Sequence, residues 1–202
     1  MTKPDLCEPA RIEAVFHPSD FSEASEVAFA HALKIALVTK AKLTILHVEA
    51  SPNTEWEDFP GVRDTLERWG LLPKRSPKSA VGSLGINVAK IIKLSPDPVM
   101  ACLDYLEAHS EDLIVLAVRQ QEGRMRWLGR SVGKPIAEGA GQMTLLIPYG
   151  VEGFVSRQDG SVSLRNILIP VTAKPRRAVA RERGHQIVRE VDAANSVVVR
   201  VR

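Results

Sequence analysis

The chain has 202 residues, of which 45% are hydrophobic and 25% are charged. A chain of this length can form one packed domain and about a third of a second one. No apolar run approaches the roughly 20 residues that cross a bilayer, and the N-terminus lacks the basic start and apolar middle of a secretory signal. We therefore expect a soluble, cytoplasmic protein that does not contact a membrane.

The net charge of +3 is distributed unevenly along the chain. Residues 151–202 hold ten Lys or Arg against five Asp or Glu, whereas the first 150 residues sum to about −2. A basic tail could meet an anionic partner, but a solvated face explains it more simply. No nucleic-acid partner is predicted.

Cysteine chemistry is not indicated. Cys7 and Cys102 are the only cysteines, and they stand far apart without a CxxC pair or a His-rich neighbour. This spacing does not fit a zinc site, a redox motif or a disulfide framework. The cysteine content agrees with a reducing compartment, and no metal ligands are predicted.

Five short apolar runs are predicted to be strands, at residues 13–16, 43–48, 88–94, 113–118 and 144–147. Apolar residues at spacings of three and four predict helices between them. One helix should bury Val27, Leu33 and Leu37, and a later one should bury Met100, Leu103 and Leu106. Since a helical crossover returns the chain to start a parallel strand, this alternation predicts a five-stranded, mostly parallel, doubly wound Rossmann-like α/β sheet.

Two segments lack a clear period. Residues 53–83 contain several Pro, Gly and Ser around a short helical piece at 62–69, and they are predicted to be a crossover with a flexible loop. Residues 149–163 contain three Gly and three Ser and predict a linker or a surface excursion.

The first strand pattern returns after residue 163. Residues 168–172 resemble residues 15–20, a strand that runs into proline, and the interval from Pro170 to Val201 (31 positions) matches that from Pro18 to Val48 (30 positions). We interpret the chain as an N-terminal segment (1–11), a complete domain (12–148), a linker (149–163) and an incomplete second β-α-β repeat (164–202). That fragment buries too little to be stable alone, so it must pack on the first domain or on another chain, or remain poorly ordered.

Candidate binding residues lie where strands end, because open parallel sheets bind ligands at the carboxyl ends of their strands. Pro18, Ser19 and Asp20 follow the first predicted strand. Ser19 or Ser22 can cap the next helix. Asp20 has two interpretations: it belongs to that helix start, or it accepts hydrogen bonds from a ribose or an adenine amine.

The fourth predicted strand runs into a basic loop. The loop holds four arginines: Arg119, Arg124, Arg126 and Arg130. Loops in this place bind phosphate when glycines let backbone N–H groups approach the anion, yet only Gly123 and Gly129 are glycine here. Two interpretations of this loop stay equally open: its arginines bind phosphate, or they are merely exposed to solvent.

These features together resemble the universal stress protein family over about residues 10–148. The likeness is closest at residues 18–23, at residues 46–48 and at residues 112–116. The resemblance implies the same five-strand parallel architecture, and the repeat is similar to tandem members of the family, here with a truncated second domain.

The resemblance also implies a nucleotide site. Pro18, Asp20 and Val48 match family positions that contact adenine or ribose. The family's phosphate pattern, Gly-x2-Gly-x9-Gly-Ser/Thr, lacks all three glycines in this sequence, although Gly129 could replace the third if the loop shifts by one. The pattern falls on Ala117, Gln120, Arg130 and Ser131. The resulting candidates for nucleotide binding are Pro18, Ser19, Asp20, Val48, Ala117, Arg119, Gln120, Gly129, Arg130, Ser131 and Val132. ATP is the only cofactor candidate, and its binding is expected to be weak at most.

By this resemblance we expect a non-catalytic stress-response protein that acts through dimer or partner interactions. Family members typically dimerise through their last strand, and the run from Met143 to Ile147 is an uncharged apolar edge that a second copy would cover. The sequence holds no GxSxG elbow, HExxH, Walker loop or metal-spaced cluster. No catalytic residue is therefore predicted.

Two other functions stay open. One is slow ATP hydrolysis or phosphotransfer, with Asp20 and Ser131 holding the nucleotide, the arginine loop stabilising charge and His17 as a candidate base. Against it, His17 and His47 fit satisfied residues at the rim of a sheet. The other is a flavoprotein of the electron-transfer class, which would need a second cofactor-binding domain.

Overall fold

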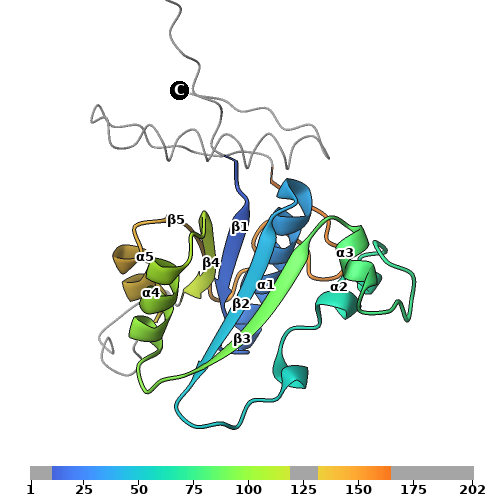
Figure 1. Cartoon of the computed structure of the whole chain (residues 1–202). Coiled ribbons are helices and arrows are strands. Elements are labelled where there is room, and N and C mark those ends of the chain that lie inside the picture. Colours follow the sequence, from blue (N-terminus) through green and yellow to red (C-terminus); the bar gives the residue numbers. More distant parts are fainter. Residues whose placement is uncertain (1–10, 119–131, 165–202) are drawn as a thin grey trace, which may run out of the picture.

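Five parallel strands form one sheet in the order β3-β2-β1-β4-β5 (Figure 1). The computed structural model describes residues 11–118 and 132–164. The strands are β1 (Ala14–Pro18), β2 (Lys42–Glu49), β3 (Asn87–Leu94), β4 (Leu113–Val118) and β5 (Met143–Pro148). The helices are α1 (Glu23–Thr39), the 3-10 turn η1 (Trp56–Asp58), α2 (Val62–Arg68), α3 (Ala80–Ser83), α4 (Pro98–Ala108) and α5 (Gly133–Gly139). The predicted parallel α/β sheet is confirmed.

Helices cover both faces of the sheet, with α4 and α5 on one side and α1, α2 and α3 on the other (Figure 1). Successive side chains of a strand point to opposite faces. Val15 therefore packs under α1, whereas Phe16 packs under α4 and stacks on Tyr105. Because both faces are covered, the central strands read as continuous apolar runs. The predicted strands are recognisable for that reason.

Helix α1 is apolar nearly all round. Ser22 caps its start by accepting a hydrogen bond from the Ser25 N–H, and Glu23 and Glu26 place negative charge at the positive end of the helix. Lys40 ends it in a left-handed conformation. Such a helix must be covered on several sides, and the sheet covers only one of them.

The outer side of α1 is covered by residues 151–163, which we call the strap. This segment, predicted to be a linker or a surface excursion, packs against α1. Val155 is fully buried and forms an antiparallel bridge with Val162. Gly153 has a φ of +75°, and a side chain there would collide with the His31 ring. The strap thus completes the core around α1.

Helix α4 buries a different face from the one predicted. Asp97 caps it and Pro98 begins it, and its inward residues are Ala101, Cys102, Tyr105 and Leu106. The expectation that Met100 is buried is wrong, since this side chain is 53% exposed. The spacing of 101, 102, 105 and 106 turns position 100 outward.

The segment 53–83 forms η1, α2 and α3, and the predicted helix at 62–69 is confirmed by α2 with Trp69 at its end. Within the two described ranges, no helix combines the length and the apolar character that a membrane crossing needs. The second repeat from residue 165 on, residues 1–10 of the N-terminal segment, and the candidates Arg119, Gln120, Gly129, Arg130 and Ser131 lie outside these ranges.

Candidate functional site

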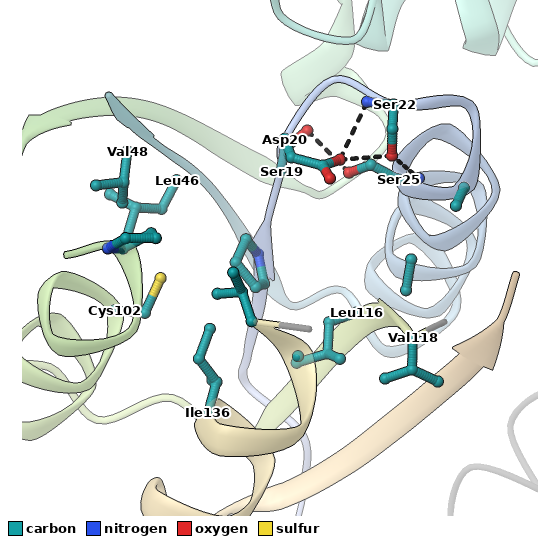
Figure 2. Close-up of a pocket in the computed structure, with 16 residues that line it drawn as sticks. Ser19, Asp20, Ser22, Ser25, Leu46, Val48, Cys102, Leu116, Val118 and Ile136 are labelled. Atoms are coloured by element: carbon teal, nitrogen blue, oxygen red, sulfur yellow. Dashed lines mark hydrogen bonds between the residues drawn. The ribbon is translucent and has the colours of Figure 1, made fainter. Parts of the chain in front are cut away.

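A cavity of about 380 Å³ opens at the carboxyl ends of β1, β2 and β4 (Figure 2). The strand order reverses between β1 and β4, which is where open α/β sheets bind ligands. Its size falls within the usual range for small-molecule sites. Every sequence-predicted site residue that the structure describes lines it: Pro18, Ser19, Asp20, Val48, Ala117 and Val132.

The floor of the cavity is apolar. Leu46, Leu116 and Ile136 are buried beneath it, and Val48 and Val118 are half-buried at its sides (Figure 2). Its polar groups gather on one side, in the loop that joins β1 to α1. This arrangement suits a flat apolar group in the interior with hydrogen-bonding groups at the rim.

Sequence reasoning missed several lining residues, among them Leu46, Cys102, Leu116, Gly133 and Ile136. Leu46 and Leu116 stood in predicted strands two places before a strand end, so the alternation of side chains was a usable signal. Cys102 and Ile136 come from α4 and α5, and only the packing of these helices brings them to the cavity.

Asp20 holds the rim loop together and also faces the cavity. Its Oδ1 accepts hydrogen bonds from the backbone N–H of Ser22 at 3.0 Å and from the Ser22 hydroxyl at 2.6 Å. Its Oδ2 has no hydrogen bond to any residue in 11–118 or 132–164. The two sequence-based interpretations are therefore compatible, because one oxygen supports the helix start and the other is available to a ligand.

Phe21 adopts a left-handed backbone conformation with φ of 59°, which is unusual for a bulky residue. Its N–H donates to the Ser19 hydroxyl at 3.3 Å, and its ring stacks on His47 at 4.0 Å between centroids. His47 in turn donates from Nδ1 to the Ser19 carbonyl at 2.8 Å. These contacts hold the loop in a strained shape next to the cavity.

His17 lies beneath this loop and is completely buried. Its Nδ1 donates to the Val115 carbonyl at 2.9 Å, and its Nε2 lies 3.5 Å from the Ser25 hydroxyl, which contacts the Ser19 hydroxyl at 3.0 Å. Burial lowers the pKa of His17 to about 4. The ring is therefore neutral at physiological pH and serves as a satisfied structural residue of the sheet.

Gly133 brings the start of α5 against β4. A Cβ at this position would lie 2.7 Å from Leu116 Cδ1 and 2.9 Å from the Ala117 carbonyl oxygen. Only glycine permits this approach, which closes one wall of the cavity. Val132, the last of the sequence candidates, immediately precedes it.

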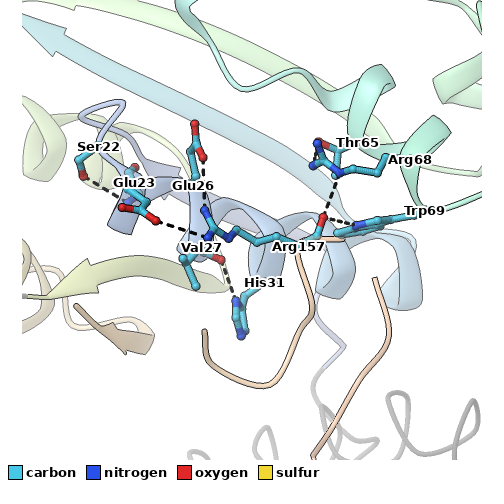
Figure 3. Close-up of polar contacts among 10 residues, drawn as sticks. Ser22, Glu23, Glu26, Val27, His31, Thr65, Arg68, Trp69 and Arg157 are labelled. Atoms are coloured by element: carbon cyan, nitrogen blue, oxygen red, sulfur yellow. Dashed lines mark hydrogen bonds and ion pairs between the residues drawn. The ribbon is translucent and has the colours of Figure 1, made fainter. Parts of the chain in front are cut away.

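The strap is connected to the rim of the cavity through the first turn of α1. The Arg157 guanidinium lies 3.5 Å from a carboxylate oxygen of Glu23 and 3.5 Å from one of Glu26 (Figure 3). The Arg157 carbonyl accepts hydrogen bonds from Trp69 Nε1 and Arg68 Nε at 3.2 and 3.0 Å. The strap therefore joins α1 to α2, although each exposed ion pair contributes little by itself.

Residues 11–118 and 132–164 contain no group of His, Cys, Asp and Glu arranged to hold a metal ion. Cys102 lines the cavity, but burial raises the pKa of its thiol to about 12, so it stays protonated.

The comparisons with known proteins point to one family. The model of the universal stress protein family matches residues 13–148. No match was found among curated protein sequences. Among solved structures, the universal stress protein UspA from Lactobacillus plantarum shares 24% identity at a TM-score of 0.44, over 68% of this chain and 99% of that one.

Two further solved structures contain bound ligands. A universal stress protein in complex with cAMP shares 21% identity at a TM-score of 0.43, over 68% of this chain and 98% of that one. The universal stress protein from Archaeoglobus fulgidus in complex with dAMP shares 17% identity at a TM-score of 0.42, over 67% and 97%.

Proposed function

The chain belongs to the universal stress protein family, and from this premise we propose that it is a non-catalytic stress-response protein whose β1/β4 cavity weakly binds an adenine nucleoside or nucleotide. The observation that carries the proposal is the cavity of about 380 Å³ at the reversal of strand order, with an apolar floor and Asp20 at its rim. Binding would make the protein a sensor that presents its state to a partner.

The apolar part of the cavity supports an adenine ring. Leu46, Leu116 and Ile136 offer a desolvated floor on which a flat heterocycle can pack. At the rim, the Asp20 Oδ2 is positioned to accept a hydrogen bond from a ribose hydroxyl or an amine. A charge-assisted hydrogen bond of this kind contributes about 1.5–3 kcal/mol.

The part of the site where the phosphates of a nucleotide would lie offers fewer favourable contacts. Ala117, at the position of the first family glycine, carries a side chain at the edge of the cavity, and the other two glycine positions hold Gln120 and Arg130. Backbone N–H groups are then less able to approach phosphate. We therefore propose that most of the affinity comes from the nucleoside, and that adding phosphates increases it little.

ATP hydrolysis is not proposed. His17, the candidate base, is fully buried, has a pKa of about 4 and uses its Nδ1 for the Val115 carbonyl. A general base must reach the proton that it removes. His17 is enclosed beneath the rim loop and does not meet that condition.

The proposal is tested by calorimetric titration of the full chain with adenosine, AMP and ATP, with and without Mg²⁺. We expect adenosine and ATP to bind within about tenfold of each other, because the phosphate end contributes few contacts. Absence of binding by all three ligands at millimolar concentration, together with no thermal stabilisation, would refute nucleotide recognition.

A substitution of Asp20 tests whether adenosine binds in this cavity. Asp20→Asn keeps an acceptor oxygen for Ser22 but removes the charge, so the loop should persist while adenosine affinity falls about tenfold or more. Asp104→Asn is the matched control, since Asp104 is an exposed residue that does not line the cavity. Equal adenosine affinity in both variants would contradict the role of Asp20.

We also propose a homodimer that forms through β5. Within residues 11–118 and 132–164 this strand is one edge of the sheet without a further strand paired to it, and an apolar edge of this kind invites a second strand. Leu146 on β5 is 43% exposed, and Tyr149 and Val151 just beyond it are exposed as well. Light scattering should give a dimer that Leu146→Lys converts to a monomer, whereas Leu94→Lys on the opposite edge strand should not. A monomeric wild type at high concentration would contradict this.

A further inference from the structure

A second groove, of about 720 Å³, lies at the outer edge of the sheet beside β3, η1, α2 and α3. It shares no lining residue with the β1/β4 cavity. Its walls come from the crossover 53–83, the part of the domain with the least regular sequence. The size is sufficient for a drug-sized molecule.

One wall is aromatic and exposed. The Trp56 ring is stacked on Phe59, with centroids 5.8 Å apart and planes at 23°. Phe59 is buried, but Trp56 is 58% exposed. A large indole surface held in place by a buried ring is a preformed platform for another flat group, because stacking on it removes apolar area from water.

The floor presents an ammonium group that forms no direct ion pair within the described residues. The Lys90 ammonium lies 5.5 Å from the centre of the Phe59 ring and is half-buried. It has no hydrogen bond or ion pair with any residue of the described ranges. Burial lowers its pKa and the nearby charge of Lys78 lowers it further, while the charges of Asp64 and Glu57 partly offset these effects. The net effect still lowers the pKa, and an anion in direct contact with the ammonium would oppose it.

The other charged residues of the groove favour a ligand with a single negative charge over a polyanion. Arg63 is already paired, at 3.1 Å with Asp64 and at 3.7 Å with Glu67. Glu57 and Asp64 also line the groove and bring negative charge near it. They would repel a polyanion such as a nucleoside triphosphate but allow a single negative group next to Lys90.

We propose that this groove binds a monoanionic aromatic acid, with its ring against Trp56 and its acid group at Lys90. The juxtaposition of an exposed aromatic platform and an unpaired, half-buried ammonium in one groove carries this inference. It does not depend on nucleotide binding in the β1/β4 cavity.

The test uses 1-naphthoate as the probe and neutral 1-naphthamide as its isosteric control, titrated calorimetrically into the full chain. Naphthoate should bind, and naphthamide should bind about tenfold more weakly or worse, because it cannot pair with the ammonium. Lys90→Gln should reduce naphthoate affinity about tenfold, and Trp56→Ala should reduce it as well.

Lys93→Gln is the matched control on the same strand. Lys93 points to the opposite face, where its Nζ donates to the Ala101 carbonyl and pairs with Asp104. It should leave naphthoate affinity unchanged, as should Asp20→Asn in the other cavity. The proposal is overturned if wild type does not bind naphthoate at millimolar concentration, if naphthamide binds equally well, or if Lys90→Gln has no effect. Loss of binding in Asp20→Asn alone would also overturn it, because the probe would then occupy the β1/β4 cavity.

Discussion

The Nε2 atom of His31 accepts a hydrogen bond from the backbone N–H of Phe154 at 2.9 Å, across a separation of 123 residues. The same nitrogen accepts a second hydrogen bond from the Val155 N–H at 3.1 Å, while Nδ1 donates to the Val27 carbonyl at 2.8 Å. Only a neutral imidazole with its proton on Nδ1 can make all three bonds. The tautomer of this buried histidine therefore helps to hold the strap on α1, together with the ion pairs of Arg157 with Glu23 and Glu26.

Replacing His31 should release the strap. In His31→Ala, two backbone N–H groups lose their acceptor and a buried ring leaves a gap, which should lower the free energy of unfolding by about 2–4 kcal/mol. Urea denaturation measures the loss, and tryptic cleavage after Arg157 should become faster. His109→Ala, at an exposed position at the end of α4, should cost less than about 1 kcal/mol. If His31→Ala resists trypsin as well as the wild type does, His31 does not hold the strap on α1.

Acid should destabilise the fold through its buried histidines. The pKa of His17 is lowered from 6.5 to about 4, so folding disfavours its protonated form. The stabilisation is complete above pH 6.5 and is lost as pH falls from 6.5 to 4, at about 1.4 kcal/mol per pH unit and about 3 kcal/mol in all. His31, whose pKa is also lowered by burial, adds in the same direction.

The direct measurement is an NMR titration of the His17 imidazole, with urea denaturation at each pH. A His17 resonance that titrates near pH 6.5 while the protein stays folded would show that the ring is not enclosed as described.

Gly133 and Gly82 should respond in opposite ways to alanine. At Gly133 the new methyl would meet Leu116 and the Ala117 carbonyl, so α5 must move and the free energy of unfolding should fall by about 1–3 kcal/mol. At Gly82 nothing lies within 4 Å, and φ is not in the left-handed region. There the smaller entropy of the unfolded chain should raise stability by about 0.4–1 kcal/mol. Thermal melts of the two variants measure these opposite changes in stability. Equal melting temperatures would show that Gly133 does not make the close contact with Leu116 and Ala117.

Cys102 should resist alkylation in the folded protein. With a thiol pKa of about 12, only about one molecule in ten thousand carries a thiolate at pH 8, and the side chain is buried as well. Iodoacetamide labelling followed by peptide mass spectrometry should modify Cys102 rapidly in urea and very slowly without it. Equal rates in the two conditions would show that the cavity exposes the thiol.

The α/β architecture could be predicted because strands buried on both faces leave continuous apolar runs. Residues 113–118 form such a run, and β4 has those same bounds. The rim of the cavity was also predictable in part, since Pro18, Asp20 and Val48 stand at the ends of recognisable strands. Their convergence follows from parallel pairing, which brings the carboxyl ends of the strands to one edge.

The strap was not predictable from pattern. Its residues show no helical or strand period, and its attachment depends on His31, Trp69 and Arg68, which are far away in sequence. Local sequence encodes periodicity and turn chemistry, whereas a hydrogen bond across 123 residues depends on where the whole chain places α1. The apolar character of α1 on all sides was the one available sign that something must cover it.

The sequence by itself determined the alternation of strands and helices, the ends of the strands, and the polar side chains of the loop that joins β1 to α1. These features depend on neighbours along the chain. The tertiary structure decided the rest: the neutral state of His17, the closure of the cavity by Gly133, and the placement of Lys90 and Trp56 on the same Phe59 ring. Each of these depends on burial and on atoms from distant segments, and burial is a property of the packed chain rather than of any stretch of it.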